Sequence, residues 1–247
     1  MRRLLSFVSM VFFLALPVAQ PAAAADRVAL VIGNSKYQHS SPVALGADNA
    51  RAMAGMLRGI GCEVTETVDA DRNAMKAAIE RFGLAAADAK TVVIYYSGQG
   101  VQVSGTTYFV PIDAKLDAPV DLVPNAIALD DVLSSVAKAR VALLFLDAGR
   151  TSPFRGQQPL APRRGGAEPN EMLLSFATGP DLRTVDGAGP TSAYTAALIR
   201  RLPVPGVAIR QALAQVRSDV LQATGNRQTP WDHSTLGDDV VLVPAKR

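Results

Sequence analysis

An apolar run over 91–96 leads directly into the polar stretch Tyr95-Tyr96-Ser97-Gly98-Gln99-Gly100. A second apolar run over 141–146 leads in the same way into Phe145-Leu146-Asp147-Ala148-Gly149-Arg150. Nearly continuous apolar runs of this length are typical of strands that are buried on both faces of a parallel sheet. Ligands in such sheets bind beyond the carboxyl ends of the strands. We therefore expect both polar stretches to lie at one edge of the sheet and to line a single pocket.

Strands and helices alternate along the rest of the chain. Besides the two strands above, the pattern predicts strands over 27–33, 62–68, 172–177 and 240–243, and a short hairpin arm over 106–110. It predicts helices over 47–58, 71–87, 129–139, 193–202 and 207–223. Such alternation indicates an α/β fold: a mostly parallel sheet of about six strands between two layers of helices, a three-layer α/β/α sandwich.

The first 25 residues have the features of a secretion signal. Arg2 and Arg3 precede an apolar run over 4–19, and small residues at 22–25 suit a signal peptidase. The alternative is an uncleaved membrane anchor, but the run contains Pro17 and is shorter than the roughly twenty residues that a spanning helix needs. We expect cleavage after residue 24 or 25, a periplasmic or secreted protein without membrane attachment, and one domain over 26–247.

Composition and charge disfavour several classes of function. Removal of the two leader arginines lowers the formal net charge of +3 by two, and no basic stripe with interleaved aromatic residues indicates nucleic-acid binding. The segment 33–37 after the first strand lacks the Gly-x-Gly-x-x-Gly spacing of a dinucleotide site. One cysteine, Cys62, and two histidines, His39 and His233, cannot form a disulfide or a zinc site within the chain. We predict no cofactor and no metal, and Cys62 as a buried apolar residue.

The two polar stretches resemble the motifs of the caspase-like cysteine peptidases, the C14 peptidases of clan CD, and above all their bacterial metacaspase and orthocaspase branch. In that family the first motif is similar to Tyr-Ser-Gly-His-Gly and the second to Asp-Ala-Cys-Arg. Further segments similar to the family cover almost the whole mature chain: 29–37, 108–113, 176–178, 191–198 and 224–231. The resemblance implies the caspase-hemoglobinase-like sandwich, with 26–150 matching the large subunit, 171–247 the small subunit and 151–170 the loop between them.

Within this resemblance the two reactive groups are absent. Gln99 stands where the family has its histidine, and Gly149 stands where it has its cysteine. Thiol-dependent hydrolysis needs a thiolate and an imidazole that moves protons near neutral pH. A glutamine amide does not titrate in a useful range, and glycine has no side chain. Since the loss of catalytic groups that act together costs on the order of a millionfold in turnover, we predict that the chain is not a peptidase.

The resemblance also assigns roles to other residues of the pocket, but these residues do not all match the family's pattern equally well. Asp147 matches an aspartate that helps to receive a basic substrate side chain in metacaspases; the alternative is a strand-end carboxylate that caps backbone amides. Asn49 stands where a second acid is expected, which weakens the case for a basic substrate. For Gln99 and Gly149 the alternatives are a solvent-facing loop residue and a backbone turn. The predicted residual pocket comprises Ser97, Gly98, Asp147, Arg150 and Asn49.

These features predict a protein that binds rather than cuts. We expect a peptide or protein partner, with an active peptidase as one candidate, for which the domain is a scaffold, decoy or regulator. We also expect a monomer, as in the metacaspase branch. The alternative is a weak or unorthodox hydrolase that uses Ser97, Thr151 or Ser152. The loop 151–170 is rich in proline and glycine and is predicted to be exposed and mobile. Since active relatives cut themselves in the matching loop, Arg163-Arg164 is a candidate site for cleavage by a partner protease.

Overall fold

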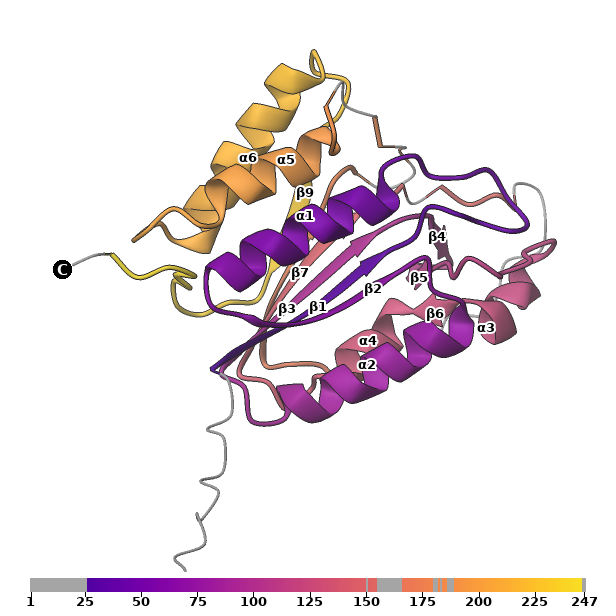
Figure 1. Cartoon of the computed structure of the whole chain (residues 1–247), viewed down its shortest axis with the longest axis horizontal. Coiled ribbons are helices and arrows are strands. Elements are labelled where there is room, and N and C mark those ends of the chain that lie inside the picture. Colours follow the sequence, from indigo (N-terminus) through magenta and orange to yellow (C-terminus); the bar gives the residue numbers. More distant parts are fainter. Residues whose placement is uncertain are drawn as a thin grey trace, which may run out of the picture.

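The computed structural model of the chain describes residues 26–149, 151–154, 166–179, 182, 184–185 and 189–245. Its central sheet has six strands in the order β2-β1-β3-β7-β8-β9, and every neighbouring pair is parallel except β8 and β9 (Figure 1). The strands are β1 (Arg27–Gly33), β2 (Glu63–Val68), β3 (Thr91–Ser97), β7 (Val141–Asp147), β8 (Glu171–Phe176) and β9 (Trp231–Ser234). The prediction of a mostly parallel, six-stranded α/β sheet is confirmed.

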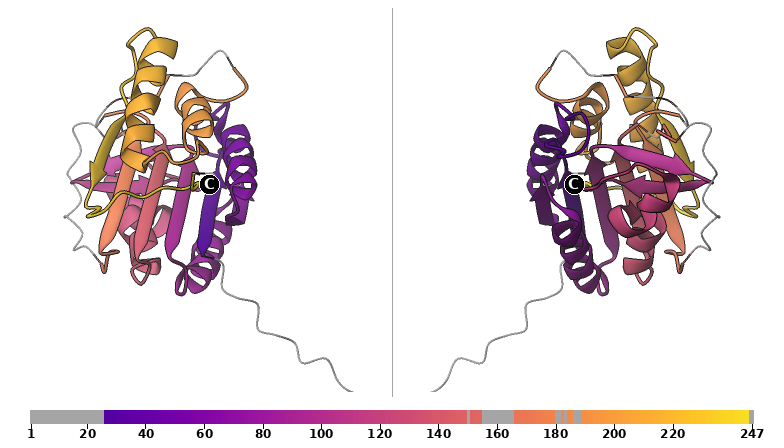
Figure 2. Two further views of the ribbon diagram at one scale, coloured as in Figure 1. Left: turned by 90° about the vertical axis from the view of Figure 1, so that its left-hand side faces the viewer. Right: turned by 90° about the vertical axis from the view of Figure 1, so that its right-hand side faces the viewer.

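Helices cover both faces of the sheet, as the three layers in Figure 2 show. One face carries α1 (Gly46–Gly59), α5 (Ala193–Arg201) and α6 (Ile209–Ala223); the other carries α2 (Arg72–Ala86) and α4 (Leu129–Ser135). Successive side chains of a strand point to opposite faces. Accordingly, Leu30 of β1 packs in the cluster under α2 and α4, whereas Val31 packs in the cluster under α1, α5 and α6. Because the central strands have a core on each side, their sequences are apolar throughout.

A second, smaller sheet lies next to the carboxyl ends of the central strands. It consists of β4 (Gly100–Val103), β5 (Thr106–Phe109) and β6 (Ile127–Ala128), all antiparallel. The 3-10 turn η1 (Pro119–Asp121) and the short helix α3 (Leu122–Asn125) lie between β5 and β6 in the chain. The turn between β4 and β5 has positive φ at both Ser104 (51°) and Gly105 (83°), the conformation that suits a two-residue hairpin. The predicted hairpin arm is therefore confirmed, and β6 extends it.

Close packing at the end of β1 fixes helix α1 beside this edge. A Cβ atom on Gly33 would lie 2.3 Å from the Cβ of Ala50 and 2.5 Å from the carbonyl oxygen of Gly46. Only glycine leaves room for the helix to approach the strand so closely. The first turn of α1, which contains Asn49, is thereby held at the carboxyl edge of the sheet.

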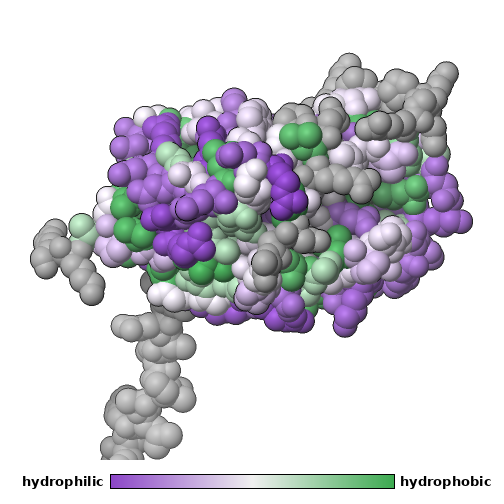
Figure 3. All heavy atoms as spheres, turned by 90° about the horizontal axis from the view of Figure 1, so that it is seen from above, coloured by the Kyte–Doolittle hydropathy of each residue, from purple (hydrophilic) through white to green (hydrophobic). Residues whose placement is uncertain are grey.

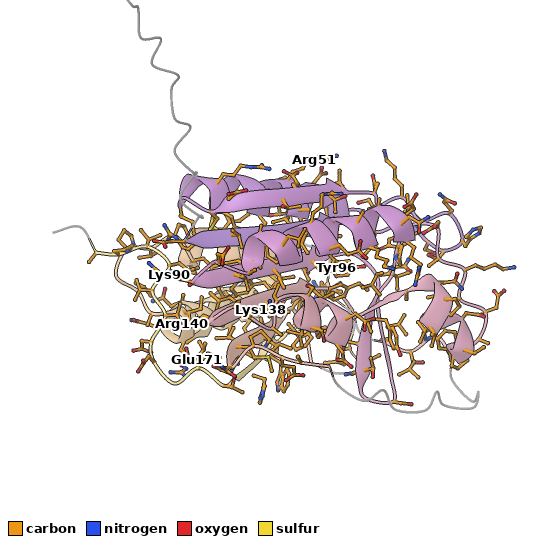
Figure 4. The ribbon with its side chains drawn as sticks, turned by 90° about the horizontal axis from the view of Figure 1, so that it is seen from below. Arg51, Lys90, Tyr96, Lys138, Arg140 and Glu171 are labelled. Carbon is orange, nitrogen blue, oxygen red and sulfur yellow. The ribbon has the colours of Figure 1, made fainter. Side chains whose placement is uncertain are left out.

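The two ends of the sheet differ in character. Figure 4 shows Lys90, Arg140 and Glu171 at the amino-terminal ends of the strands, whereas Tyr96 lies inside, further along the strands toward their carboxyl ends. The outer surface on the side of the molecule that carries α1, α5 and α6 has hydrophilic and hydrophobic residues interspersed (Figure 3). None of the helices in the described part of the chain has the length and apolar character that a membrane span requires. The predicted leader over 1–25 lies outside the described residues and stays a prediction.

Three local predictions need correction. The segment 240–243 does not complete the sheet: it forms one isolated bridge, between Val241 and Ala208, and its side chain Leu242 is buried in the cluster under α6. The last strand is β9 instead. The predicted helix 129–139 ends at Ser135 as α4. The loop after β7 is not exposed throughout, because Phe154 is buried against the small sheet; Arg163-Arg164 lies outside the described residues.

Candidate functional site

A pocket of about 600 Å³ opens at the carboxyl ends of β3 and β7. The register of these strands pairs Ser97 with Asp147, so Gln99 and Gly149 each follow two residues after the last pair. Both residues line the pocket, together with the segment 40–45, which precedes α1. The structure therefore brings the two polar stretches into one site. Of the predicted pocket residues, those that line it are Ser97, Gly98, Asp147 and Asn49; Arg150 lies outside the described residues.

Two buried phenols fix the backbone of residue 99. The amide N–H of Gln99 donates to the hydroxyl of Tyr37 at 2.7 Å, and the hydroxyl of Tyr96 donates to the carbonyl oxygen of Gln99 at 2.6 Å. A Cβ atom on Gly98 would lie only 2.6 Å from the Tyr37 hydroxyl, so the chain passes between the two phenols only because this residue is glycine. The main chain at residue 99 is thus held firmly in place.

Burial keeps both phenols neutral. Loss of solvent raises the pKa of Tyr37 to about 12 and raises the pKa of Tyr96 well above its ordinary value. The Tyr96 ring also stacks on Phe109 of β5, with the ring centroids 4.2 Å apart and the planes 6° from parallel. A neutral phenol both donates and accepts a hydrogen bond. Tyr37 and Tyr96 are therefore structural supports for residue 99 rather than proton carriers near neutral pH.

The side chain of Gln99 binds the wall of the pocket. Its amide nitrogen donates to the carbonyl oxygen of Ser41 at 2.7 Å, and its amide oxygen accepts from the hydroxyl of Ser40 at 3.1 Å. The residue is half-buried. Gln99 is therefore a partly exposed residue whose side chain is hydrogen-bonded to the wall of the pocket.

Asp147 is the centre of a buried polar network. One carboxylate oxygen accepts hydrogen bonds from the hydroxyls of Ser192 at 2.5 Å and Thr195 at 2.6 Å, and from the side-chain amide of Asn49 at 3.2 Å. The hydroxyl of Tyr95 approaches the same oxygen to 3.5 Å and lies 2.5 Å from that of Thr195. Asp147 is 5% exposed. The described donors to this oxygen are all side chains.

Asn49 uses both ends of its amide in this network. Its oxygen accepts the backbone N–H of Ser192 at 2.9 Å, and its nitrogen donates to Ser97 at 3.0 Å as well as to Asp147. A carboxylate at position 49 has no proton to donate and would put a second negative charge beside Asp147. The neighbouring aspartate thus explains why an asparagine suits this position.

Ser192 and Thr195 are site residues that the sequence analysis missed. Ser192 caps α5 by accepting the backbone N–H of Thr195 at 3.0 Å, and its hydroxyl also donates to Asp147. The cap pattern, a serine directly before an apolar helix, was readable in the sequence. It places the start of α5 but carries no information about Asp147, since 45 positions separate the two residues along the chain.

Other candidate groups are placed less favourably for chemistry. Thr151 lines the pocket, whereas the hydroxyl of Ser152 accepts the backbone N–H of Phe154 at 3.2 Å. His233 lies on β9, where its ring stacks at 6.5 Å on Trp231. Cys62 is buried, as predicted, and burial raises the pKa of its thiol. Within the described ranges, no three His, Cys, Asp or Glu side chains are grouped closely enough to hold a metal ion.

Comparison with known proteins agrees with this architecture. The family model of the caspase domain, that of the C14 peptidases, matches residues 26–241. The chain belongs to the caspase-domain family. Caspase-1 from Spodoptera frugiperda superposes on it with a TM-score of 0.67 and 15% identity, over 94% of this chain and 98% of that one, which shows a shared fold. The resemblance inferred from the two motifs is confirmed at the level of the family.

A curated human relative matches a shorter stretch. Mucosa-associated lymphoid tissue lymphoma translocation protein 1 is 29% identical over 91 residues, which are 37% of this chain. The match spans only 11% of the length of that relative. The relative is therefore similar to one part of the caspase domain of this chain.

Proposed function

We propose that this chain is a catalytically inactive caspase domain that binds a peptide or protein segment in its pocket. The observation that carries the proposal is a pair of residues that line that pocket, Gln99 and Gly149. The first has an amide with no useful titration, and the second has no side chain. The pocket itself is of the size that holds a ligand, since ligand sites commonly measure roughly 300–1,000 Å³.

The fold does not depend on the two missing groups. Its cores consist of strand and helix side chains on the two faces of the sheet. Two phenols support the backbone at residue 99, whatever side chain it bears. Function resides in sites carried on folds, so a framework can keep its cleft after its chemistry is gone. We propose a scaffold, decoy or regulator, with an active peptidase as one possible class of partner, acting as a monomer.

Restoring both groups tests whether the cleft is intact. The double variant Gln99→His with Gly149→Cys is assayed on peptides that end in arginine, lysine or aspartate before the reporter group. We expect the double variant to cleave one of these classes, while the wild type and each single variant do not. A folded double variant without activity would show that the binding face has diverged from a peptidase cleft. Cleavage by the wild type would contradict the proposal outright.

The alternative of a hydroxyl-dependent hydrolase is supported by the position of Ser97 and Thr151 at the pocket. A serine or threonine nucleophile needs a neighbouring base. The described partner of the Ser97 hydroxyl is the Asn49 amide, a donor and not a base, and no histidine is among the described residues that line the pocket. Labelling by a serine-reactive fluorophosphonate that is lost in Ser97→Ala or Thr151→Ala would favour this alternative over simple binding.

Secretion is part of the proposal and has its own test. We propose that the first 25 residues direct export and are removed. Expression of the full chain in a bacterial host, followed by mass spectrometry of the periplasmic fraction, should give a product that starts at Ala25 or Asp26. A product that retains residues 1–24 and sediments with the membranes would contradict it. Incubation with active relatives, followed by mapping of the products, tests cleavage after Arg163 or Arg164.

A further inference from the structure

The segment 39–42, here called the flap, forms one wall of the pocket. Ser40, Ser41 and Pro42 line the pocket, and every residue of the flap is exposed. Backbone hydrogen bonds hold the chain on either side of the flap: Gln38 donates to Ile112 at 2.8 Å, and Val43 donates to Ser35 at 3.0 Å. Between these anchors the flap donates no backbone hydrogen bond to any residue that the structure describes.

The side chain of Gln99 makes the hydrogen bonds that hold the flap between its anchors. It donates to the Ser41 carbonyl and accepts from the Ser40 hydroxyl. An amide carries its donor and its acceptor on one carbon, so a single side chain reaches two successive residues. The fixed end of this connection is the backbone of residue 99, which Tyr37 and Tyr96 hold on both sides.

We propose that Gln99 is a latch that holds the flap against the pocket and so determines how large a ligand the pocket admits. This inference goes beyond the proposed function, because it concerns access to the pocket whatever the ligand is. The flap is exposed and depends on Gln99 for its cross-connection, so loss of the side-chain amide leaves it free to swing outward about Gln38, a motion that opens the adjoining hydrogen bond from Val43 to Ser35. An imidazole cannot replace the amide here, since its two nitrogens lie on different sides of a ring.

Hydrogen exchange tests the latch. Gln99→Asn keeps the amide but shortens the side chain by one methylene, and Gln99→Glu keeps the length but removes the donor to Ser41. Two ordinary hydrogen bonds at an exposed site favour the latched state by roughly tenfold. We therefore expect exchange at the Val43 amide to speed up roughly tenfold in Gln99→Asn, and at least roughly threefold in Gln99→Glu, which keeps the acceptor for Ser40. Gln102→Asn, a half-buried glutamine of β4 that is not among the pocket-lining residues, is the matched control and should leave this rate unchanged.

Thiol labelling tests access to the pocket. In a Cys62→Ala background, Gly149→Cys places one thiol in the pocket, and its labelling rate is measured with iodoacetamide and with a bulky pyrene maleimide. We expect Gln99→Asn to raise the rate with the bulky reagent at least severalfold more than the rate with iodoacetamide. Unchanged exchange at Val43, with core strand β3 still protected, would overturn the latch. Faster exchange with an unchanged ratio of labelling rates would overturn its control of access.

Discussion

Removal of the Asp147 carboxylate should destabilise the fold measurably, because the network around it joins three distant parts of the chain. Ser192 and Thr195 lie at the start of α5, Asn49 lies in α1, and Asp147 ends β7. Asp147→Ala removes the acceptor of three buried donors, the side chains of Ser192, Thr195 and Asn49. Each of these side chains keeps one other hydrogen bond. At about 1 kcal/mol for each donor, the loss is about 3 kcal/mol. Since domains are stable by roughly 5–15 kcal/mol, the variant should remain folded.

Urea unfolding measures this loss through the fluorescence of the single tryptophan, Trp231. With a slope of about 2 kcal/mol per M, the midpoint of Asp147→Ala should fall by roughly 1.5 M. Asp238→Ala, at an exposed turn, is the matched control and should stay within about 0.5 kcal/mol of the wild type. A midpoint that falls by less than about 0.3 M would refute the role of Asp147 as the centre of the network.

A double-mutant cycle with Ser192 separates the pair from the rest of the network. Ser192→Ala removes the bond to Asp147 and the cap of α5, each worth about 1 kcal/mol. In the double variant the Ser192–Asp147 bond is lost only once. The free-energy changes should therefore fall short of additivity by about 1 kcal/mol. Strict additivity would mean that the 2.5 Å contact contributes nothing.

Three further predictions concern stability. Burial raises the pKa of Tyr37 to about 12, whereas the unfolded chain releases this proton near 10. Titration of Tyr37 should therefore lower stability by about 2 kcal/mol as pH rises from 10 to 12, and denaturant midpoints across this range that do not fall would contradict the burial of this phenol. Gly98→Ala should lower the free energy of unfolding by about 2–3 kcal/mol, because the new Cβ would overlap the Tyr37 hydroxyl. Gly105→Ala, where φ is positive but the space is open, should lower it by about 1 kcal/mol. Equal losses in the two variants would contradict the close approach of Gly98 to Tyr37. Phe154→Ala should lower the free energy of unfolding by about 3 kcal/mol, because Phe154 is buried against the small sheet. Its control, Leu84→Ala, removes a side chain that is 79% exposed and should change that free energy by less than about 0.5 kcal/mol. A Phe154→Ala variant as stable as the wild type would place the start of the loop outside the core.

The centre of the fold was predictable from the sequence because its strands are buried on both faces. β1, β3 and β7 have core clusters on either side, so their apolar character is continuous and the strands are recognisable without neighbours. The edge of the sheet at β9 was not predictable in this way. Trp231–Ser234 is largely exposed and polar, since β9 has only one neighbouring strand. The segment 240–243 is apolar because Leu242 packs against helices. The sequence pattern alone does not distinguish such a segment from a buried strand.

The candidate site was predictable in position but not in detail. Parallel strands that end in polar stretches place the pocket at one edge, and the register of Ser97 with Asp147 agrees. The contacts of Asp147 with Ser192 and of Gln99 with Ser41 join residues 45 and 58 positions apart. Such contacts depend on the path of the loops, and local propensity carries no information about it. The motif comparison identified the two altered positions, but it gave Gln99 no role in binding the flap.

Turnover by the wild-type protein tests the central proposal, that the domain is catalytically inactive. The measurement is the release of a fluorophore from peptides that end in arginine, lysine or aspartate, with purified wild-type protein and with the Ser97→Ala and Thr151→Ala variants as controls for contamination. We predict a rate indistinguishable from buffer, and the same rate in all three proteins. Saturable hydrolysis by the wild type that disappears in one of the hydroxyl variants would show that the domain is a working hydrolase after all.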